Sequence, residues 1–279
     1  MLKLFERDIA AVDQRLVVIA PPYASIPGSL QNVTVDPAER ELLIQEVQRL
    51  RGSIYLRDGA LKADDLTPDG RHETREDEKS WHLLVMDEQR RVSGCIWYRE
   101  HERMPAFHQL RVRDCALAHT DEWRERLQTA VEGEIARARR ERIRYAEVGG
   151  WAVACGSRCF SAGLLLVLGT YGLSQIAGGA LVVATATVRH SSAKILRRLG
   201  GSHLEGDGFV VPPYYDPRYD CDMELLRFDT RRPSAKYAGL VELLKGRLAN
   251  VEVVSSGSPV IQAAAYASVP MRGLAIAAA

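Results

Sequence analysis

The sequence has little net charge and few cysteines, and both shortages exclude classes of protein. Its 279 residues include 37 basic and 36 acidic side chains, which give a formal net charge of +1. A dedicated nucleic-acid or membrane-surface protein normally carries a clear excess of positive charge, so we expect neither. The five cysteines have no regular spacing. This suits a reducing compartment and leaves no complete set of zinc ligands, so no metal is expected.

Apolar segments that direct export or span a membrane are also missing. Charged side chains recur throughout the first segment, MLKLFERDIAAVDQ, where a secretion signal would need an apolar core. No charged side chain lies between Arg158 and Arg189, but Gly178 and Gly179 interrupt this run. A membrane-spanning helix needs about 20 continuous apolar residues. We therefore predict a cytoplasmic protein without stable membrane insertion, and the uncharged run as its core.

The pattern within the uncharged run predicts a helix followed by a strand. Apolar residues recur at three- and four-residue spacing from Leu164 to Ile176, as on one face of a helix. After the glycine pair, residues 180–188 are short, β-branched and apolar, which is typical of a strand buried on both faces. Residues 145–201 therefore read as strand, glycine turn, helix, glycine turn, strand and helix.

The remaining elements complete an α+β arrangement around one mixed sheet. In chain order we predict a strand at 15–20, a helix from Asp36 to a stop at Gly52, strands at 80–87 and 92–98, an extended segment at 105–118, a helix at 120–142, strands at 209–213 and 222–228, and a helix at 235–248. The charged segment 66–78 contains a Pro-Asp-Gly turn and is either a solvated loop or part of a site.

Four segments follow from this division of the chain. We predict an N-terminal extension (1–35), a main domain (36–232), a C-terminal helix (233–254) and a mobile tail (255–279). The tail is rich in alanine and serine and carries a single charge.

The order of elements resembles the GNAT acyltransferase superfamily over about residues 51–228. The segment VATATVRHSSAKILRRLGG is similar to the late strand and helix of that superfamily. The segment DGRHETREDEKSWHLLVMDEQRRVSGCIWYR resembles the acyl-homoserine-lactone synthases and the long-chain N-acyl amino acid synthases. The resemblance implies a GNAT-like mixed, splayed central sheet flanked by helices. It also implies transfer of an acyl group from acyl-CoA or acyl-carrier protein.

Three positions depart from the pattern of these families. In CGSRCFSAG, Arg158 and Gly163 match the usual pyrophosphate loop, but its central glycine is missing. Gly150 stands where the autoinducer synthases usually have an arginine, three residues after a glutamate. Leu196 is nearest to the position where many relatives keep a tyrosine as general acid. Both donors, CoA and carrier protein, therefore remain open.

Acyl transfer needs a slot that holds the slender pantetheine arm of the donor. Where two strands of a sheet separate, their unpaired backbone groups can bind such an arm as a strand would. Residues 147–153 and 182–187 are the candidate strands, and their glycines would let a thin ligand approach the backbone. The cofactor-binding candidates are Val153, Ser157, Arg158, Gly163, Thr187 and Ser191.

The reaction also needs a group that accepts the proton of the attacking amine. Glu147 is the leading candidate, because a carboxylate in an otherwise apolar strand is poorly solvated; the alternative is a solvated glutamate at the sheet edge. The acidic segment adds His72 and Glu73 as catalytic candidates. The substrate-binding candidates, suited to an amine or to its orientation, are Asp69, Arg71, Asp77 and Trp81.

The sequence thus predicts an enzyme that transfers an acyl group to the amine of a small, amino-acid-like metabolite. A catalytically inactive GNAT-fold binding module is the alternative. Cys155 and Cys159 offer a less favoured nucleophile, because no histidine partner is evident. DNA binding through SSAKILRRLGG, or through the arginines at 137–144, is disfavoured by the near-neutral charge and by the interleaved glutamates.

Overall fold

One mixed sheet organises the residues that the computed structural model describes, which are 16–22, 24–101, 104–154, 159–257 and 260–262. Within them the sheet has ten strands in the order β11-β12-β7-β6-β5-β4-β1-β13-β3, with β8 paired to β12. They are β1 (Leu16–Ile19), β3 (Val33–Val35), β4 (Trp81–Met86), β5 (Val92–His101), β6 (Arg144–Val153), β7 (Ala180–Thr187), β8 (Ser202–His203), β11 (Tyr214–Asp216), β12 (Cys221–Asp229) and β13 (Glu252–Ser255).

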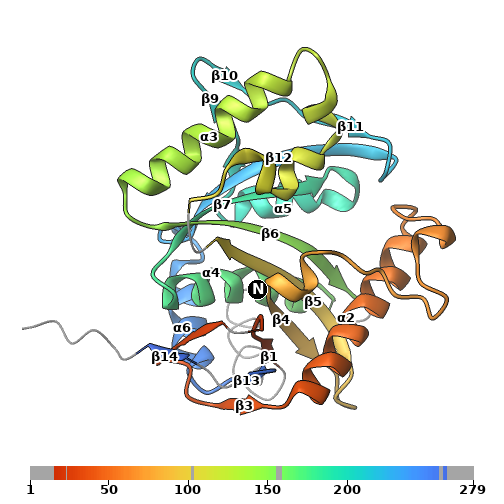
Figure 1. The fold of residues 1–279 in the computed structure, drawn as a ribbon, viewed down its shortest axis with the longest axis vertical. Coiled ribbons are helices and arrows are strands. Elements are labelled where there is room, and N and C mark those ends of the chain that lie inside the picture. The colour runs from red at the N-terminus through yellow and green to blue at the C-terminus, as the bar shows by residue number, and fades with distance from the viewer. Residues whose placement is uncertain (1–15, 23, 102–103, 155–158, 258–259, 263–279) are drawn as a thin grey trace, which may run out of the picture.

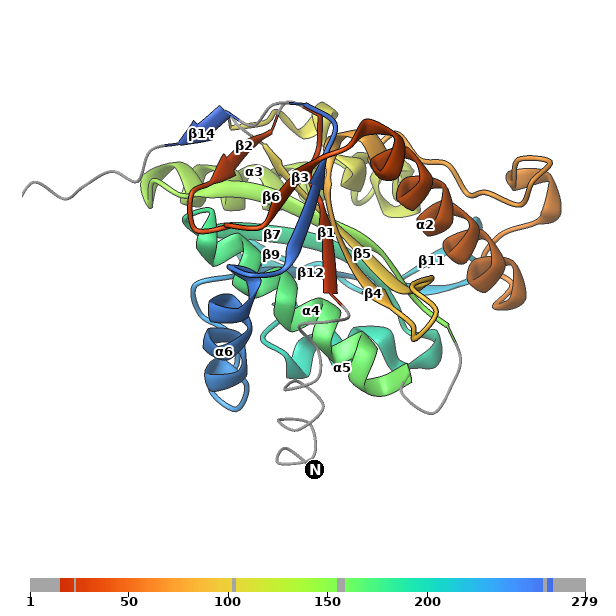
Figure 2. The ribbon, with the colours of Figure 1, turned by 90° about the horizontal axis from the view of Figure 1, so that it is seen from below.

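Helices cover both faces of this sheet. They are α2 (Pro37–Arg57), α3 (Arg124–Arg140), α4 (Cys159–Ile176), α5 (Ser192–Arg198) and α6 (Ala238–Leu248). Figures 1 and 2 show α4, α5 and α6 on one face and α2 and α3 on the other. Two small pairs lie outside the sheet: β2 (Ser25–Pro27) with β14 (Val260–Gln262), and β9 (Glu205–Gly206) with β10 (Phe209–Val210). The predicted α+β class is therefore confirmed.

The apolar core divides differently on the two faces. Under α4, α5 and α6 the buried side chains form one continuous cluster. On the other face, α2 and α3 each cover a separate apolar cluster. No helix in the described part of the chain is long and apolar enough to cross a membrane, and α4, which carries much of the uncharged run, packs against the sheet and α6.

Helix α2 begins as predicted but does not end at Gly52. The Asp36 side chain caps the helix by accepting hydrogen bonds from the backbone N–H groups of Ala38 and Glu39, at 3.0 and 2.9 Å. The helix then continues through Gly52 to Arg57. A Cβ atom at position 52 would stand 2.4 Å from the carbonyl oxygen of Gly70. Gly52 is therefore the point at which the charged segment crosses the helix, not a stop signal.

Other predicted boundaries shift in the structure. The predicted extended segment at 105–118 forms three short 3₁₀ turns, η4 (Phe107–Gln109), η5 (Arg111–Asp114) and η6 (Ala116–His119). The next helix begins at Arg124, not at residue 120. Of the remaining turns, η2 (Ala63–Asp65) lies just before the charged segment, η3 (Asp77–Lys79) lies at its end, and η7 (Arg189–Ser191) precedes α5.

The predicted division of the chain stays a prediction. The structure does place β1 and β3, from the predicted N-terminal extension, in the same sheet as the main domain. Strand β13 follows α6 and lies between β1 and β3 in that sheet. Of the predicted tail, 258–259 and 263–279 fall outside the described residues, and 260–262 form β14.

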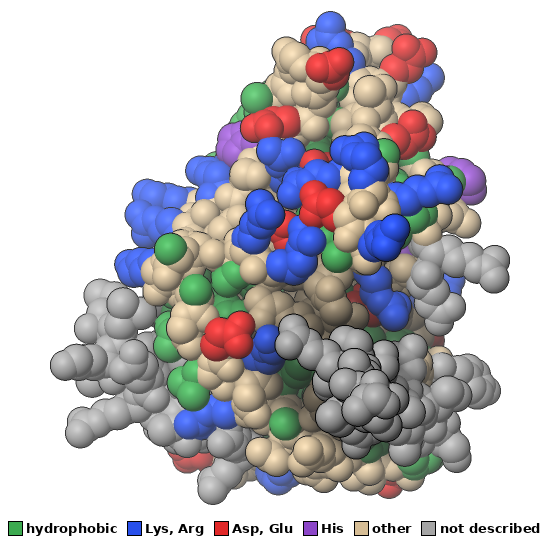
Figure 3. Space-filling view, turned by 90° about the vertical axis from the view of Figure 1, so that its left-hand side faces the viewer, with side chains coloured by type: hydrophobic (Ala, Val, Ile, Leu, Met, Phe, Trp, Pro, Cys, Tyr) green, Lys and Arg blue, Asp and Glu red, His purple; other side chains and the backbone are tan. Residues whose placement is uncertain are grey.

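The arginine-rich end of α3 is balanced by acidic side chains. Arg137 pairs with Glu134 and Glu141, and Arg231 pairs with Glu141 and Asp229. Figure 3 shows mainly basic side chains, with a few acidic ones among them, across the middle of the side of the molecule that lies to the left in Figure 1. The interpretation of a solvated helix face stays a prediction.

The close crossing at Gly52 predicts a stability effect. We expect Gly52→Ala to destabilise the protein by about 1–3 kcal/mol, because the added methyl group must displace backbone at residue 70. The matched control is Gly133→Ala in α3, an exposed helical position where a Cβ atom would meet nothing within 4 Å. Its higher helix propensity should stabilise the protein by up to about 1 kcal/mol. Urea denaturation of both variants measures the difference, and equal stabilities would contradict the packing argument.

Candidate functional site

Strands β6 and β7 separate at their C-terminal ends. They pair in parallel from Arg144 with Ala180 up to Val148 with Ala184, and no further pair joins them in the described residues. Strand β6 continues alongside β5 as far as Val153, and β7 continues alongside β12 as far as Thr187. The divergence is visible in Figure 1. The predicted splayed sheet is therefore confirmed, with its fork after Val148 and Ala184.

A glycine pair in β6 marks the start of the fork. Residues Gly149 and Gly150 lie where the pairing with β5 shifts register, and Gly150 has a φ of 63°. Cβ atoms at these positions would stand 2.5 and 2.3 Å from atoms of the Trp97 indole ring. The Trp97 ring therefore fills the space that the missing side chains leave, and the approach of a thin ligand to these glycines stays a prediction.

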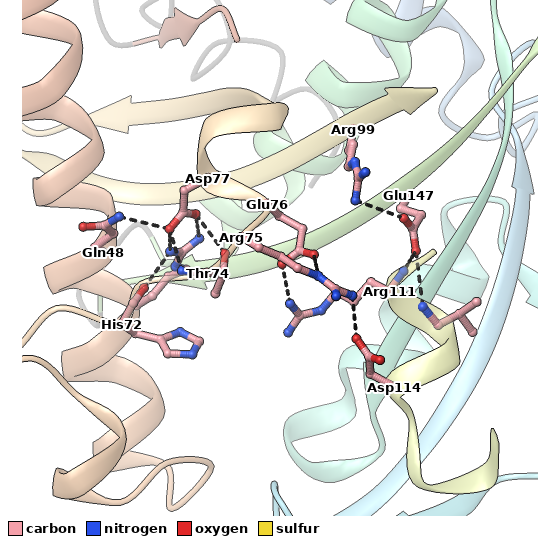
Figure 4. Close-up of polar contacts among 12 residues, drawn as sticks. Gln48, His72, Thr74, Arg75, Glu76, Asp77, Arg99, Arg111, Asp114 and Glu147 are labelled. Atoms are coloured by element: carbon pink, nitrogen blue, oxygen red, sulfur yellow. Dashed lines mark hydrogen bonds and ion pairs between the residues drawn. The ribbon is translucent and has the colours of Figure 1, made fainter. Parts of the chain in front are cut away.

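A pocket lies at the fork, between β5, β6, β7 and the turn η5. We call it the fork pocket. It is lined by Trp97, Arg111, Val112, Glu147, Val148, Val183, Ala184 and Thr185. Its lining residues Val112 and Val183 belong to the apolar cluster under α3. The charged residues Arg111 and Glu147 of the lining are linked to further charged side chains (Figure 4).

Glu147 is buried in β6, with 3% of its surface exposed. Its Oε1 atom accepts hydrogen bonds from the backbone N–H groups of Arg111, at 2.7 Å, and Val112, at 3.3 Å. Its Oε2 atom lies 3.2 Å from Nε2 of His101 and 3.9 Å from Nη1 of Arg99. The carboxylate is therefore anchored on both oxygens (Figure 4), and the alternative of a solvated edge glutamate does not apply.

Arg111 belongs to a chain of alternating charges beside the fork pocket. Its Nη1 donates to Oε2 of Glu76 at 2.6 Å, and Glu76 is fully buried. The other Glu76 oxygen accepts from Nε of Arg75 at 2.9 Å, and Arg75 in turn pairs with Asp114. The Arg111 guanidinium lies 6.0 Å from the centre of the Trp97 ring, so this network fixes a cation over an aromatic wall.

A second ion pair joins α2 to the charged segment. Arg51, which is 1% exposed, donates two hydrogen bonds of 2.7 Å to the Asp77 carboxylate. Burial alone would raise the pKa of Asp77, but the hydrogen bonds and charge of Arg51 outweigh it and lower that pKa to about 2. Arg51 also donates to the carbonyl oxygen of His72 at 2.7 Å. The pair therefore fixes the chain at His72.

His72 is held neutral beside this pair. Burial, followed by the charges of Arg51 and Arg111, lowers the pKa of His72 to about 4. The ring packs edge-on against Tyr55 at 5.8 Å, and its Nδ1 atom is buried without a hydrogen-bond partner among the described residues. In Figure 4 the His72 ring points away from Asp77. A neutral imidazole with a vacant nitrogen can accept a proton.

The other candidates in the charged segment lie at its solvent side. Asp69 accepts from Arg49 and Arg71, and Glu73 pairs with Arg71. These carboxylates are thus already neutralised, and their predicted roles stay predictions. Trp81 is buried in the apolar cluster under α4, on the opposite face of the sheet from the fork pocket.

The described donor-binding candidates lie on β6, β7, α4 and the turn before α5. Val153 and Thr187 end the two separated strands. Gly163 lies in α4, where a Cβ atom would meet the Trp151 ring at 3.1 Å. Ser191 precedes α5 in a left-handed conformation and makes no side-chain cap. Ser157 and Arg158 lie outside the described residues, and Cys155 does also.

Sequence reasoning missed three residues of the site. Arg51 lies within the predicted helix, and nothing in a helical pattern indicates that a distant loop will bury an arginine. Trp97 follows the alternation of β5 and was counted only as a strand residue. Arg111 lies in the segment expected to be extended, where its partners at Glu76 and Glu147 are 35 and 36 residues away.

Comparison with known proteins identifies the fold. No protein-family model matches the sequence, and no curated protein matches it significantly. Among solved structures, one that is similar is the CoA-dependent acyl-homoserine lactone synthase BjaI, solved with SAM and isopentyl-CoA. It is 16% identical in sequence with a TM-score of 0.50, and the match covers 88% of this chain and 95% of BjaI. The chain has a GNAT-like fold. TofI, solved in a ternary complex with an inhibitor and MTA, is 11% identical with a TM-score of 0.50, over 84% of this chain and 99% of TofI.

A third similar structure belongs to the other group that the sequence resembles. FeeM, an N-acyl amino acid synthase from uncultured soil microbes, is 14% identical with a TM-score of 0.43, covering 71% of this chain and 88% of FeeM. The GNAT-like fold of the chain rests on BjaI and TofI, and at these identities the likeness concerns the fold alone.

The buried ion pair predicts a large stability loss when one partner is removed. Asp77→Asn leaves the Arg51 charge buried and unpaired, so we expect a loss of about 3–5 kcal/mol in the free energy of unfolding. Asp69→Asn, which removes an exposed carboxylate from the same segment, is the matched control and should change stability little. Urea denaturation at neutral pH compares them. Similar losses of unfolding free energy in both variants would mean that the burial of the Arg51–Asp77 pair does not make Asp77→Asn more costly.

The depressed pKa of His72 predicts a pH-dependent stability. Between the ordinary value of 6.5 and the folded value of about 4, the unfolded chain binds a proton that folded His72 does not. Stability should therefore fall as the pH is lowered through this range, and buried His82, whose pKa burial also lowers to about 4, acts in the same direction. His72→Gln should reduce this dependence by about one proton. Denaturation at several pH values measures it, with His119→Gln at an exposed position as control.

Proposed function

We propose that the protein is an N-acyltransferase that moves an acyl group from a thioester to the amine of a small, amino-acid-like metabolite. The observation that carries this proposal is the fork between β6 and β7. Past the fork, the facing edges of the two strands are free of each other, so the amide groups of a pantetheine arm can pair with them as a strand would. The likeness to BjaI, a CoA-dependent synthase, supports the same interpretation.

The proposed donor is acyl-CoA or the phosphopantetheine of acyl-carrier protein. Val153 and Thr187, at the ends of the separated strands, would flank the arm. Gly163 lies in the adjoining helix α4, and Ser157, Arg158 and Ser191 are proposed to contact the phosphate end. The BjaI structure contains isopentyl-CoA, which supports CoA as one donor for a protein of this fold.

The charges around the fork pocket favour an acceptor that carries a carboxylate. The three buried carboxylates near it are each matched by cationic groups: Glu76 by Arg75 and Arg111, Asp77 by Arg51, and Glu147 by Arg99 and backbone N–H donors. No unpaired buried carboxylate remains among these three to hold a cationic amine. Arg111, which lines the fork pocket, is the proposed partner of an acceptor carboxylate in addition to Glu76.

In the proposed reaction, the neutral amine of the acceptor attacks the carbonyl carbon of the thioester. The C–N bond forms, the C–S bond breaks, and the thiolate leaves to be protonated as the free thiol. His72 is the proposed acceptor of the amine proton, because its vacant Nδ1 is neutral at the pH of the reaction. Because the pKa of His72 is about 4, the acceptor amine becomes protonated before His72 does as the pH falls. Loss of activity on acidification therefore reflects protonation of the amine.

The test is release of free thiol, measured with acyl-CoA and with acyl-carrier protein in the presence of amino acids, and identification of the product by mass spectrometry. We expect acceptor-dependent thiol release by the wild type. His72→Gln should lower turnover on the order of 10²-fold, because it removes the proton acceptor, whereas His119→Gln should retain it. Both variants should fold.

Two results would count against the proposal. An absence of thiol release with either donor across the acceptor panel, together with retained binding of acyl-CoA in calorimetry, would favour the inactive binding module. Full activity of His72→Gln would leave the acyltransferase in place but would remove His72 as the proton acceptor.

A further inference from the structure

The buried carboxylate of Glu147 connects two elements that are distant in sequence. Glu147 lies in β6, and Oε1 accepts hydrogen bonds from the first two backbone N–H groups of η5, those of Arg111 and Val112. The residues are 36 and 35 positions apart. The first N–H groups of a helical turn have no partner within the turn itself, so Glu147 acts as a cap supplied by another element. Charge-assisted bonds of this kind are stronger than neutral ones.

The second oxygen of Glu147 is held by two further side chains. Oε2 is within 3.2 Å of His101 Nε2 and 3.9 Å of Arg99 Nη1. A proton added to Oε1 would direct an O–H group at two backbone N–H groups that themselves donate. Oε1 of Glu147 is therefore already occupied in holding the turn, and this geometry suits it to accept hydrogen bonds from η5 rather than to contact an acceptor amine.

The turn that Glu147 anchors carries Arg111 into the fork pocket. From its backbone, fixed by Glu147, the Arg111 side chain extends over Trp97 and meets Glu76 through Nη1 and the Tyr219 hydroxyl through Nη2, at 2.6 and 3.5 Å. Both Arg111 and Glu147 line the pocket. Loss of the backbone anchor would leave the guanidinium attached to Glu76 but with its main chain free to shift.

Arg111 lies over the same Trp97 ring that covers Gly150 in β6. A side chain at Gly150 would collide with the Trp97 ring at 2.3 Å and would approach Arg51 Nη1 at 3.3 Å. The strand therefore cannot supply a long side chain at this point while Trp97 keeps its place. The 3₁₀ turn supplies one from above the same ring instead.

We propose that Glu147 is a positioning residue that holds η5 so that Arg111 faces the acceptor, and that it does not accept the amine proton. This inference rests on the proposed acyl transfer and deepens it, because it makes Arg111 the residue that reads the acceptor carboxylate. It predicts that a hydrogen-bond-accepting oxygen on the side chain of residue 147 matters more for activity than the negative charge of that side chain.

Two substitutions of Glu147 separate the roles. Glu147→Gln keeps a carbonyl oxygen that accepts both backbone N–H groups, so we expect kcat/KM for the acceptor to fall by less than about tenfold, with an unchanged pH profile. Glu147→Ala leaves two buried N–H groups without a partner and should lower kcat/KM on the order of 10²-fold, mainly through a higher KM for the acceptor. Thermal unfolding of both variants shows whether either loss is merely one of folding.

A double-mutant cycle tests whether Glu147 acts through Arg111. If it does, Glu147→Ala combined with Arg111→Gln should lose no more activity than the worse single variant, because the second change removes a group already displaced. Arg111→Gln alone should raise the KM for amino acid acceptors more than for an acceptor whose carboxylate is replaced by an amide. Multiplicative losses in the double variant would contradict the coupling.

One result overturns the proposal. If Glu147→Gln is as inactive as Glu147→Ala, and if the loss is in kcat with a changed pH profile, then Glu147 is the proton acceptor. Backbone amide exchange at Arg111 and Val112 provides a readout that does not depend on activity. Exchange should be faster in Glu147→Ala and close to wild type in Glu147→Gln. If the wild type releases no thiol, the acyltransferase proposal fails, and this exchange comparison still decides the positioning role. If Glu147→Ala does not fold, Glu147→Gln and Arg111→Gln decide it.

Discussion

The site depends on the cost of burying carboxylates. Glu76, Asp77 and Glu147 are 0%, 2% and 3% exposed beside one face of the sheet, and an unpaired charge there would cost several kcal/mol. Each therefore has its own donors: guanidinium groups for Glu76 and Asp77, and backbone N–H groups for Glu147. Meeting this requirement brings α2, the charged segment and η5 together over the fork. The same polar network thus fixes the charged segment and η5 and surrounds the fork pocket.

The fork is a consequence of how the sheet is covered. On the face of α4, α5 and α6 one continuous apolar cluster spans the sheet, and it holds β6 and β7 together where they pair. On the other face the core is divided between α2 and α3. The fork pocket lies where β6 and β7 diverge, and it is lined in part by the cluster under α3.

Three of the glycines mark points where parts of the chain approach one another closely. Gly149 and Gly150 have no side chains because Trp97 lies over them, and Gly52 has none because the charged segment crosses α2 at that point. In both places the glycine makes room for another part of the protein. Glycines near a suspected site in a sequence therefore need not mark the path of a ligand.

The sequence alone determined most of the secondary structure and the fold class, because period, capping and apolar runs are local properties. Asp36 starts α2, the uncharged run forms α4 and β7, and the order of elements indicated a splayed GNAT-like sheet, as the structure confirms. The tertiary structure decided which charges meet. Arg51 and Asp77 are 26 residues apart, and Glu147 and Arg111 are 36 apart. A charged residue looks the same in a sequence whether it is solvated or buried, and only folding brings its partner within reach.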